Sequence, residues 1–366
     1  MNELIVELGE DSYPIFIGHG TLSLLPEKLH ELKAPERFVV ITDSEVDALY
    51  GIDFLNDLQA AGLEAIKCVV TAGEASKRLE IYDCVITQML EKRVGRDWGV
   101  IALGGGVVGD LAGFVAATFM RGLPFFQVPT SLLAQVDASV GGKVGINHPL
   151  GKNLIGAFYQ PKLVWIDTAV LQTLPERQIV AGFAEIVKHG IIFDERLFRF
   201  CEQRLDDVLN LEADVMQELI SRSCAIKADI VRQDEKEHGV RALLNFGHTI
   251  GHGLEASFSY GGILHGEAVF WGMLIEANIA RRMRLLPSDQ FDKIERFFYR
   301  IPLKTSIAGI KANELFLLMQ SDKKAKNKRL RFALPVQIGA AKITDRVGDE
   351  IYRSALDEIQ DKNWKA

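Results

Sequence analysis

Cysteine is scarce in this sequence: there are only four in a chain of 366 residues, and no two of them form a CxxC pair. Their wide separation excludes a disulfide framework and a structural zinc site built from cysteines. We therefore expect reduced thiols in a cytoplasmic protein. The four residues are Cys68, Cys84, Cys201 and Cys224.

Long apolar runs and signal segments are also missing. The most apolar stretch, residues 100–120, is interrupted by Asp110 and five glycines, which is typical of a buried strand, turn and helix rather than of a membrane span. The N-terminal sequence MNELIVELGED is acidic and lacks the shape of a signal peptide. The sequence thus predicts no membrane partner.

Positive charge is in deficit as well. The formal net charge is −7 and no basic tail is present, which argues against nucleic acid as a partner. Hydrophobic residues make up 48% and charged residues 25% of the chain, as in ordinary globular proteins. We expect the functional lysines and arginines to act locally, on a small anionic ligand.

The length exceeds what one hydrophobic core usually serves, so two domains are expected. In the first half, apolar strand patterns alternate with helical ones, which predicts an α/β domain with a parallel, Rossmann-like sheet covered by helices. Helical patterns dominate the second half, apart from a strand pattern at 330–334. We predict a nucleotide-binding domain over 1–172 and a mainly helical domain over 173–366. The main expected strands are 38–42, 65–70, 100–103 and 125–128, and the expected helices of the second half include 195–206, 212–233, 242–256, 265–283 and 288–299.

A glycine-rich turn is the clearest nucleotide signal. Gly104, Gly106 and Gly109 fit GxGxxG directly between a strand and a helix, where backbone N–H groups can approach a pyrophosphate. The acidic residue usual about twenty positions downstream is absent, so a tight turn with close helix packing is the alternative. Asp43 ends the strand FVVIT and suits either a ribose hydroxyl or the cap of the following helix.

Polar residues gather in the middle of the chain. Thr130 and Ser131 follow a predicted strand, and Arg121 precedes it. Lys143 and Lys152 each follow glycine and are expected on loops. For any single lysine, a solvated surface charge is the better interpretation. The clustering of these cations near a dinucleotide site, among glycine and apolar residues, favours an anionic substrate.

Histidines and one glutamate suggest a metal site. His248 and His252 are four residues apart on a predicted helix face, and His265 follows a Gly-rich turn. Two histidines and a carboxylate are a common catalytic zinc set with one position open. Glu185 is the candidate carboxylate. It shares a helix face with Lys188, so an ion pair between the two is the alternative.

The helical half also contains a predicted helix start and a charged run. Thr173 is expected to cap the helix that carries Glu185, with Pro175 near its first turn. Lys227 and Arg241 flank the charged run 234–238, most of which is typical of a solvated loop.

The motifs together closely resemble the 3-dehydroquinate synthase family, and the resemblance covers nearly the whole chain. The motifs, in chain order, are GEASK, GGGVVGD, VPTSLLAQVDASVGGKVGIN, GKNLIGAF, GFAEIVKHG, NFGHTIGH, LHGEA and DKK.

The resemblance implies a homodimeric lyase that uses NAD⁺ and one divalent metal ion, Zn²⁺ or Co²⁺. Its expected substrate is 3-deoxy-D-arabino-heptulosonate 7-phosphate, and its products are 3-dehydroquinate and phosphate. The implied reaction consists of transient oxidation, phosphate β-elimination, reduction and intramolecular aldol closure. It belongs to the shikimate pathway, which leads to chorismate and the aromatic amino acids.

The resemblance also implies roles for individual residues. The implied metal ligands are Glu185, His248 and His265, while His252 faces the substrate phosphate instead. The implied NAD⁺ contacts are Asp43, Gly73, Glu74, Ala75, Ser76, Lys77, Gly106, Val107, Val108, Gly109, Asp110, Thr130, Ser131, Lys143, Lys152 and Thr173. The resemblance implies that the substrate phosphate contacts Arg121, Asn153, Asn245 and Lys323 or Lys324. It implies that the substrate carboxylate contacts Lys227 and Arg241, and that the ring hydroxyls contact Asp137, Lys188 and Glu237. Lys143 is implied to lie where cofactor and substrate meet.

Three alternatives remain at this stage. A sister cyclase would act on sedoheptulose 7-phosphate or glucose 6-phosphate, which lack the carboxylate that Lys227 and Arg241 are expected to bind. A metal-dependent polyol dehydrogenase would release NADH and would not need the phosphate-binding lysines. A regulatory module would bind metal and nucleotide without turnover.

Overall fold

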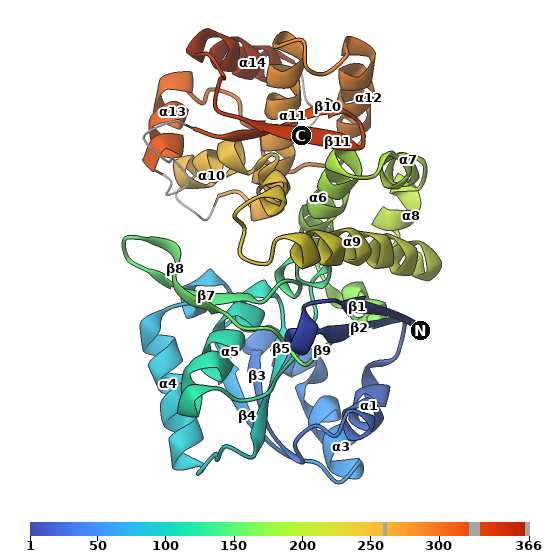
Figure 1. The fold of residues 1–366 in the computed structure, drawn as a ribbon, viewed down its shortest axis with the longest axis vertical. Helices are drawn as coiled ribbons and strands as arrows, with labels where there is room; N and C mark the ends of the chain where they lie inside the picture. The colour runs from blue at the N-terminus through green and yellow to red at the C-terminus, as the bar shows by residue number, and fades with distance from the viewer. Residues whose placement is uncertain (259–261, 322–329, 363–366) are drawn as a thin grey trace. The chain divides into compact units, whose positions relative to one another are not determined.

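The computed structural model describes residues 1–258, 262–321 and 330–362, in two compact units (Figure 1). Unit 1 comprises Met1–Leu174 and Met216–Lys236, and unit 2 comprises Pro175–Val215 and Glu237–Ala366. The first boundary between the two units, after Leu174, is close to the predicted domain boundary at 172. The helical segment Met216–Lys236, however, packs with unit 1, which sequence order alone does not reveal.

Unit 1 is built on a seven-stranded sheet with the order β1-β2-β9-β6-β5-β3-β4. All neighbouring strands are parallel except β1 and β2, which pair as an antiparallel hairpin. The strands are β1 (Asn2–Val6), β2 (Tyr13–Gly18), β3 (Arg37–Asp43), β4 (Glu64–Val70), β5 (Trp98–Gly104), β6 (Phe125–Pro129) and β9 (Leu163–Asp167).

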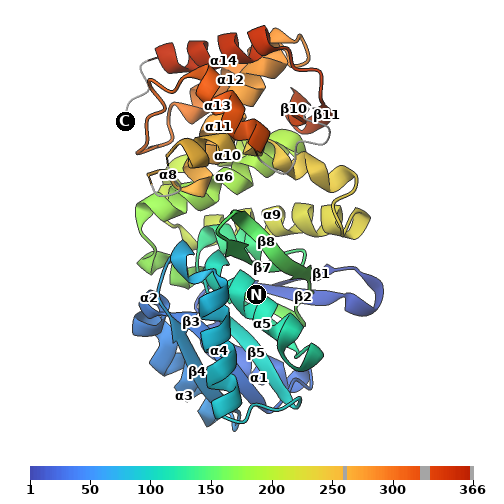
Figure 2. The same cartoon turned by 90° about the vertical axis from the view of Figure 1, so that its left-hand side faces the viewer.

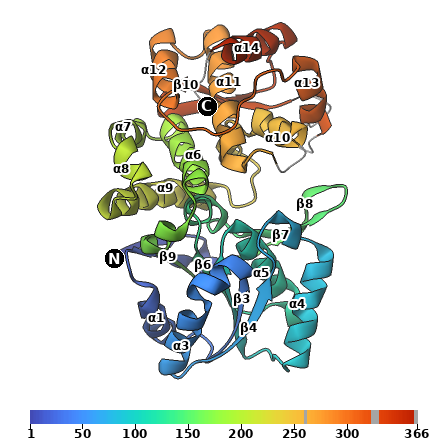
Figure 3. The same ribbon diagram turned by 180° about the vertical axis from the view of Figure 1, so that it is seen from behind.

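Helices cover both faces of this sheet (Figures 2 and 3). Helices α1 (Leu25–Glu31) and α3 (Ile52–Ala60) contribute buried side chains to one core cluster, and α4 (Leu79–Glu91) and α5 (Gly106–Thr118) contribute to the other. Because both faces are covered, the interior strand β5 is buried along its whole length. The predicted α/β architecture is confirmed.

The strand order reverses between β3 and β5. After β3 the chain passes to β4 on one side, then returns to β5, β6 and β9 on the other side. In parallel sheets of this order, ligands bind beyond the carboxyl ends of the strands at the reversal. Asp43 ends β3 and Gly104 ends β5, so both lie at this position.

The central part of unit 1 differs from the prediction. Lys143 and Lys152 were expected on loops, but β7 (Lys143–His148) and β8 (Gly151–Phe158) form an antiparallel hairpin. The hairpin relies on two opposed glycines. A Cβ atom at Gly145 would lie 2.5 Å from the Ile155 carbonyl oxygen, and one at Gly156 would lie 2.3 Å from the Val144 oxygen.

Unit 2 is mainly helical, as predicted. Helix α11 is its buried centre and packs against α6, α10, α12 and α14. The other elements assigned wholly or partly to it are α6 (Glu176–Ile192), α7 (Glu195–Gln203), α8 (Leu205–Leu209), the first residues of α9 (Ala213–Gln233), α10 (His248–Ser257), α11 (His265–Arg282), α12 (Ser288–Phe298), α13 (Ala312–Ser321), α14 (Asp349–Asp361), and the hairpin of β10 (Phe332–Gln337) and β11 (Ala340–Thr344). None of the helices in the described ranges combines the length and apolarity that crossing a bilayer requires.

One helix prediction in unit 2 is wrong. The segment 242–256 is not a single helix, because a 3-10 helix over Val240–Asn245 ends before α10 begins at His248. Gly247 separates the two with a positive φ of 79°, a conformation that favours glycine.

Candidate active site

Three side chains of unit 2 meet around one buried carboxylate oxygen. Glu185 lies in the middle of α6, while His248 and His265 are the first residues of α10 and α11. Glu185 Oε1 is 3.6 Å from His248 Nε2 and 3.9 Å from His265 Nε2. The three potential ligand atoms lie within 4.8 Å of one another.

The chemistry of this group fits a divalent metal ion. Glu185 is fully buried, and its Oε1 atom accepts no hydrogen bond from any described residue. A buried carboxylate oxygen without such a partner is costly, and a cation between it and two imidazole nitrogens would satisfy it. The set has the composition of a catalytic zinc site.

Neighbouring groups fix the two imidazole rings. His265 Nδ1 is 3.0 Å from Glu255 Oε2, and His248 Nδ1 is 3.1 Å from the Phe246 carbonyl oxygen. With Nδ1 engaged in this way, each Nε2 atom is on the side of Glu185. A carboxylate or carbonyl behind a ligating histidine is the usual arrangement that fixes its tautomer and orientation.

The alternative predicted for Glu185 is also present. Lys188 Nζ contacts Glu185 Oε2 as a buried ion pair. The two carboxylate oxygens therefore have different surroundings, one beside the lysine and one beside the histidines. The ion pair and the metal site are compatible, not exclusive.

His252 lies beside this group without joining it. Its ring centroid is 5.5 Å from that of His248 and 6.1 Å from that of His265. Its potential ligand atom groups with those of Glu255 and His265, and not with that of Glu185. The i,i+4 pair that helical spacing suggested is therefore not the pair that meets Glu185.

Other predicted residues of unit 2 lie on the segment before α10. Arg241 is 3% exposed and belongs to the 3-10 helix over Val240–Asn245. Asn245 Nδ2 donates a hydrogen bond to Glu237 Oε1 at 2.8 Å, which brings together two predicted substrate groups. Lys323 and Lys324 lie outside the described residues.

The glycine-rich turn of unit 1 has the predicted strand, turn and helix. Helix α5 begins at Gly106 after Gly105 as its N-cap residue, so its first N–H groups face the carboxyl edge of the sheet. The Thr130 N–H donates to the Gly104 carbonyl at 3.0 Å. Ser131 Oγ would be 3.3 Å from a Cβ at Gly105, so Thr130 and Ser131 border the turn. This arrangement suits a pyrophosphate at a helix N-terminus.

A buried lysine connects three segments that carry predicted NAD⁺ or substrate residues. Lys77 Nζ contacts an Asp110 carboxylate oxygen and donates to Asn153 Oδ1 at 2.5 Å. Burial raises the pKa of the Asp110 carboxyl, and the adjacent Lys77 charge opposes that rise. The GEASK segment begins at Gly73 with a φ of 101°, and its Glu74 accepts a hydrogen bond from Asn147 Nδ2 at 2.7 Å.

Two capping expectations have different outcomes. Asp43 Oδ1 accepts from the N–H groups of Glu45 and Val46 at 3.0 and 3.1 Å, so its helix-cap role is confirmed. Thr173 does not cap α6, because Pro175 is the N-cap residue. The Thr173 hydroxyl lies 2.7 Å from Tyr50 Oη instead.

Two of the predicted substrate-binding residues of unit 1 are in contact with each other, and a third lies away from the glycine-rich turn. Lys227 Nζ pairs with Asp137 Oδ1 at 2.6 Å and is 5% exposed, so a predicted carboxylate group and a predicted hydroxyl group are in contact. Arg121 follows the C-terminal end of α5, whereas the glycine-rich turn precedes its N-terminal end. The fold of unit 1 therefore does not bring Arg121 to that turn.

Comparison with known proteins identifies the family of this chain. Family models described as 3-dehydroquinate synthase N-terminal and C-terminal match residues 67–181 and 182–325. A 3-dehydroquinate synthase from Rippkaea orientalis is 46% identical over 96% of this chain and 97% of its own length. The chain belongs to the 3-dehydroquinate synthase family. Another such synthase, from Pseudoalteromonas translucida, is 45% identical over 98% of this chain and its full length.

Solved structures of related cyclases share the fold. A 2-deoxy-scyllo-inosose synthase, complexed with carbaglucose-6-phosphate, NAD⁺ and Co²⁺, matches with a TM-score of 0.87 and 25% identity over 98% of this chain and 99% of that chain. A 2-epi-5-epi-valiolone synthase from Streptomyces hygroscopicus, with NAD⁺ and Zn²⁺ bound, matches with a TM-score of 0.86 and 26% identity over 96% and 98% of the two chains.

The sequence did not lead us to one residue that contacts a proposed metal ligand directly. Glu255 holds the His265 ring, and it lies on α10 three residues after His252. A glutamate three residues after a histidine, and therefore on the same face of a predicted helix, is the sequence signal that could have identified it.

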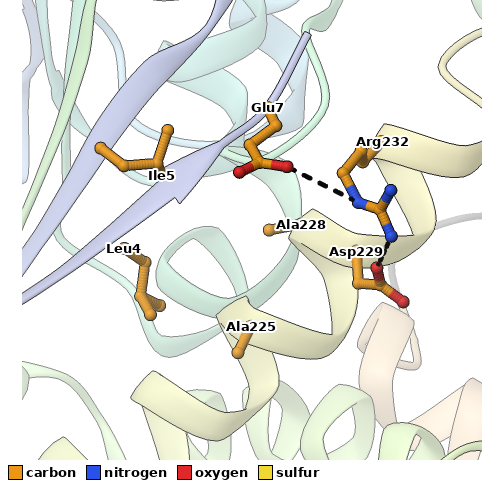
Figure 4. Close-up of a pocket in the computed structure, with 7 residues that line it drawn as sticks. All are labelled: Leu4, Ile5, Glu7, Ala225, Ala228, Asp229 and Arg232. Atoms are coloured by element: carbon orange, nitrogen blue, oxygen red, sulfur yellow. Dashed lines mark hydrogen bonds and ion pairs between the residues drawn. The ribbon is translucent and has the colours of Figure 1, made fainter.

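A small pocket of unit 1 is lined by residues that have no predicted role (Figure 4). It lies between β1 and α9, and Arg232 forms ion pairs there with Glu7 and Asp229. The lining residues are Leu4, Ile5, Glu7, Ala225, Ala228, Asp229 and Arg232.

Proposed function

We propose that this chain converts 3-deoxy-D-arabino-heptulosonate 7-phosphate into 3-dehydroquinate and phosphate, using NAD⁺ and one Zn²⁺ or Co²⁺ ion. The observation that carries the proposal is the Glu185 Oε1 atom, buried without a hydrogen bond from a described residue and facing the Nε2 atoms of two histidines. It occurs in a chain 46% identical to a 3-dehydroquinate synthase.

Glu185, His248 and His265 would hold the metal ion. When bound, NAD⁺ takes and returns a hydride at one carbon, and the metal polarises the oxygen on that carbon. Lys188 pairs with the Glu185 carboxylate through the buried contact at Oε2. Glu255 and the Phe246 carbonyl keep the two imidazoles in the tautomer that presents Nε2.

The carboxyl edge of the unit 1 sheet would hold NAD⁺. The first N–H groups of α5 would face the pyrophosphate, with Thr130 and Ser131 beside it. Asp43 Oδ1 already caps a helix, so a ribose hydroxyl would have to use the other carboxylate oxygen. Lys77 would fix the glycine-rich turn relative to the β7–β8 hairpin through Asp110 and Asn153.

Cationic side chains would orient the substrate. Lys227 and Arg241 are both buried, so their attraction for a substrate carboxylate is screened by solvent less than at an exposed site. Lys227 also pairs with Asp137, which holds its ammonium group in place. Lys143 and Lys152 lie on the β7–β8 hairpin, where flexible ammonium groups can follow one substrate through several steps. Such positioning suits a multistep reaction of a single molecule.

The proposed setting is the cytoplasm, and the proposed assembly is a homodimer. The scarcity of cysteine supports the first. Light scattering coupled to size exclusion would test the second, since a monomer at assay concentration would contradict it.

The direct test is inorganic phosphate release from the heptulosonate phosphate. The assay contains NAD⁺ well below the substrate concentration and added Zn²⁺ or Co²⁺, with a chelator-treated control. We expect many phosphates per NAD⁺, no net NADH absorbance, and loss of release with the chelator. Net NADH accumulation would indicate a dehydrogenase instead.

A sister cyclase activity is the second candidate. The structural likeness to 2-deoxy-scyllo-inosose synthase and 2-epi-5-epi-valiolone synthase favours it. The higher identity to 3-dehydroquinate synthases and the buried cations Lys227 and Arg241 favour the acid substrate. Phosphate release from glucose 6-phosphate, or cyclisation of sedoheptulose 7-phosphate, without turnover of the heptulosonate would reverse this order.

A further inference from the structure

Helix α10 begins without a capping side chain of its own. Its N-cap residue is Gly247, and its first residue is the proposed metal ligand His248. An N-cap side chain would normally accept from the N–H group of the second or third helical residue. A glycine cannot do so, and another part of the chain must satisfy these donors.

Glu276 of helix α11 takes over this task. It is fully buried, and its Oε1 accepts from the Ile250 N–H at 3.3 Å, the third residue of α10. Its Oε2 accepts from the Gly247 N–H at 2.8 Å. A carboxylate is well suited here, because the N-terminal end of a helix carries a partial positive charge.

Close packing of two glycines makes this contact possible. Gly272 lies one turn before Glu276 on α11, and a Cβ there would be 1.9 Å from the Gly247 carbonyl oxygen. A Cβ at Gly247 would be 2.5 Å from Met273 Cγ. Both positions exclude side chains, so the start of α10 lies directly against α11.

The same peptide group connects Glu276 to the proposed metal ligand. The N–H of Gly247 and the C=O of Phe246 belong to one planar amide, whose two polar ends point in opposite directions. Glu276 Oε2 holds the N–H end at 2.8 Å, and the C=O end lies 3.1 Å from His248 Nδ1. The orientation of this amide therefore sets the orientation of the His248 ring.

We propose that Glu276 is a positioning residue of the metal site, which acts on His248 through the Phe246–Gly247 peptide group. The inference rests on the proposed metal site. It differs from the direct contact of Glu255 with His265, because here the carboxylate is one peptide removed from the imidazole. Partners of ligating histidines commonly change metal affinity about 10- to 100-fold when they are removed.

The test compares Co²⁺ binding by the full-length wild-type chain, Glu276→Gln and Glu276→Ala. Affinity is measured by chelator competition, and geometry by the visible absorption of bound Co²⁺. We expect Glu276→Ala to bind about 10- to 100-fold more weakly with an altered spectrum. Glu276→Gln retains one acceptor oxygen and should fall between it and wild type, so it also serves as the test if the alanine variant does not fold.

Asn278→Ala is the matched control. Asn278 is also fully buried on α11, but its Nδ2 donates to the Ala355 carbonyl and to Glu358, away from α10. It should lose stability while retaining the wild-type Co²⁺ affinity and spectrum. Wild-type affinity and spectrum in folded Glu276 variants, or an equal loss of affinity in Asn278→Ala, would overturn the positioning role alone. A wild-type chain that binds no Co²⁺ would overturn the metal site together with this inference.

Discussion

Lys188 Nζ contacts one carboxylate oxygen of Glu185, and the other oxygen of the same carboxylate lies 3.6 Å from His248 Nε2. One fully buried carboxylate thus connects an ion pair with the proposed metal site. Since a buried charge is stable only when it is paired or coordinated, neither oxygen can be removed without consequence. The two functions of Glu185 can be separated experimentally.

Glu185→Gln should abolish tight metal binding and also lower the free energy of unfolding. Lys188 would be left buried without its anion, and breaking a buried pair from one side costs about 3–5 kcal/mol. Co²⁺ titration and urea unfolding measure the two effects. The double variant Glu185→Gln/Lys188→Met should recover much of the stability and none of the metal binding. Stoichiometric Co²⁺ at wild-type affinity in the single variant would refute the ligand assignment.

Lys77→Met should weaken NAD⁺ binding about 10-fold or more, because it removes charge-assisted hydrogen bonds worth about 1.5–3 kcal/mol each. Asp110 and Asn153 would lose the group that connects the glycine-rich turn to the hairpin. Calorimetric titration with NAD⁺ measures the effect. Lys67→Met is the matched control. Lys67 lies in the middle of β4, and its Nζ atom is 2.5 Å from Asp47 Oδ1. Equal losses of affinity in both variants would mean that the Lys77 network has no special role.

Local patterns predicted the fold where each element is decided by its own residues. The apolar run FVVIT became β3 over Arg37–Asp43, and the glycine-rich turn became the start of α5 at Gly106. The sequence prediction failed at glycines, because glycine occurs both in loops and in closely paired strands. The glycines before Lys143 and Lys152 indicated loops, yet Gly145 and Gly156 permit a tightly paired hairpin.

Contacts between distant residues could not be predicted from the sequence alone. Helical spacing pointed to His248 and His252, and only the family motifs separated His252 from the ligand set. No local pattern indicates that Glu276 caps a helix that starts 28 positions earlier. Tertiary packing decides such contacts, because it brings groups together that the sequence keeps apart.

Lys143→Ala should lower kcat/KM about 10- to 100-fold and leave the melting temperature unchanged. Lys143 is exposed at the first position of β7, so its loss creates no cavity, whereas a hydrogen bond from an ammonium to an anionic substrate contributes about 1.5–3 kcal/mol. Phosphate-release kinetics and thermal unfolding measure the two properties. Lys162→Ala removes a charge that is also exposed and has no predicted role, so it should change neither property. Near-wild-type kcat/KM in Lys143→Ala would argue against its place in the site.

Glu358 of α14 should make the free energy of unfolding of unit 2 depend on pH in the acidic range. Burial by itself would raise the pKa of this carboxyl, but hydrogen bonds and nearby cations outweigh burial and lower the pKa below its ordinary value of 4.5. The groups responsible are Asn278, Arg282, Arg281 and Lys362.

The sign of the effect follows from this lowered pKa. A carboxylate whose pKa is lower in the folded state stabilises that state above the unfolded pKa, and the stabilisation is lost as the pH falls through the folded pKa. Glu358→Gln should therefore be less stable than wild type at pH 7, by on the order of 1 kcal/mol for a partly exposed pair. The difference should shrink as the pH falls below 4.5. Urea unfolding at pH 7, 4.5 and 3.5 measures it. Glu314→Gln alters an exposed pair with Lys311 and should have little effect at any pH, while a deficit in Glu358→Gln that stays constant with pH would contradict the linkage.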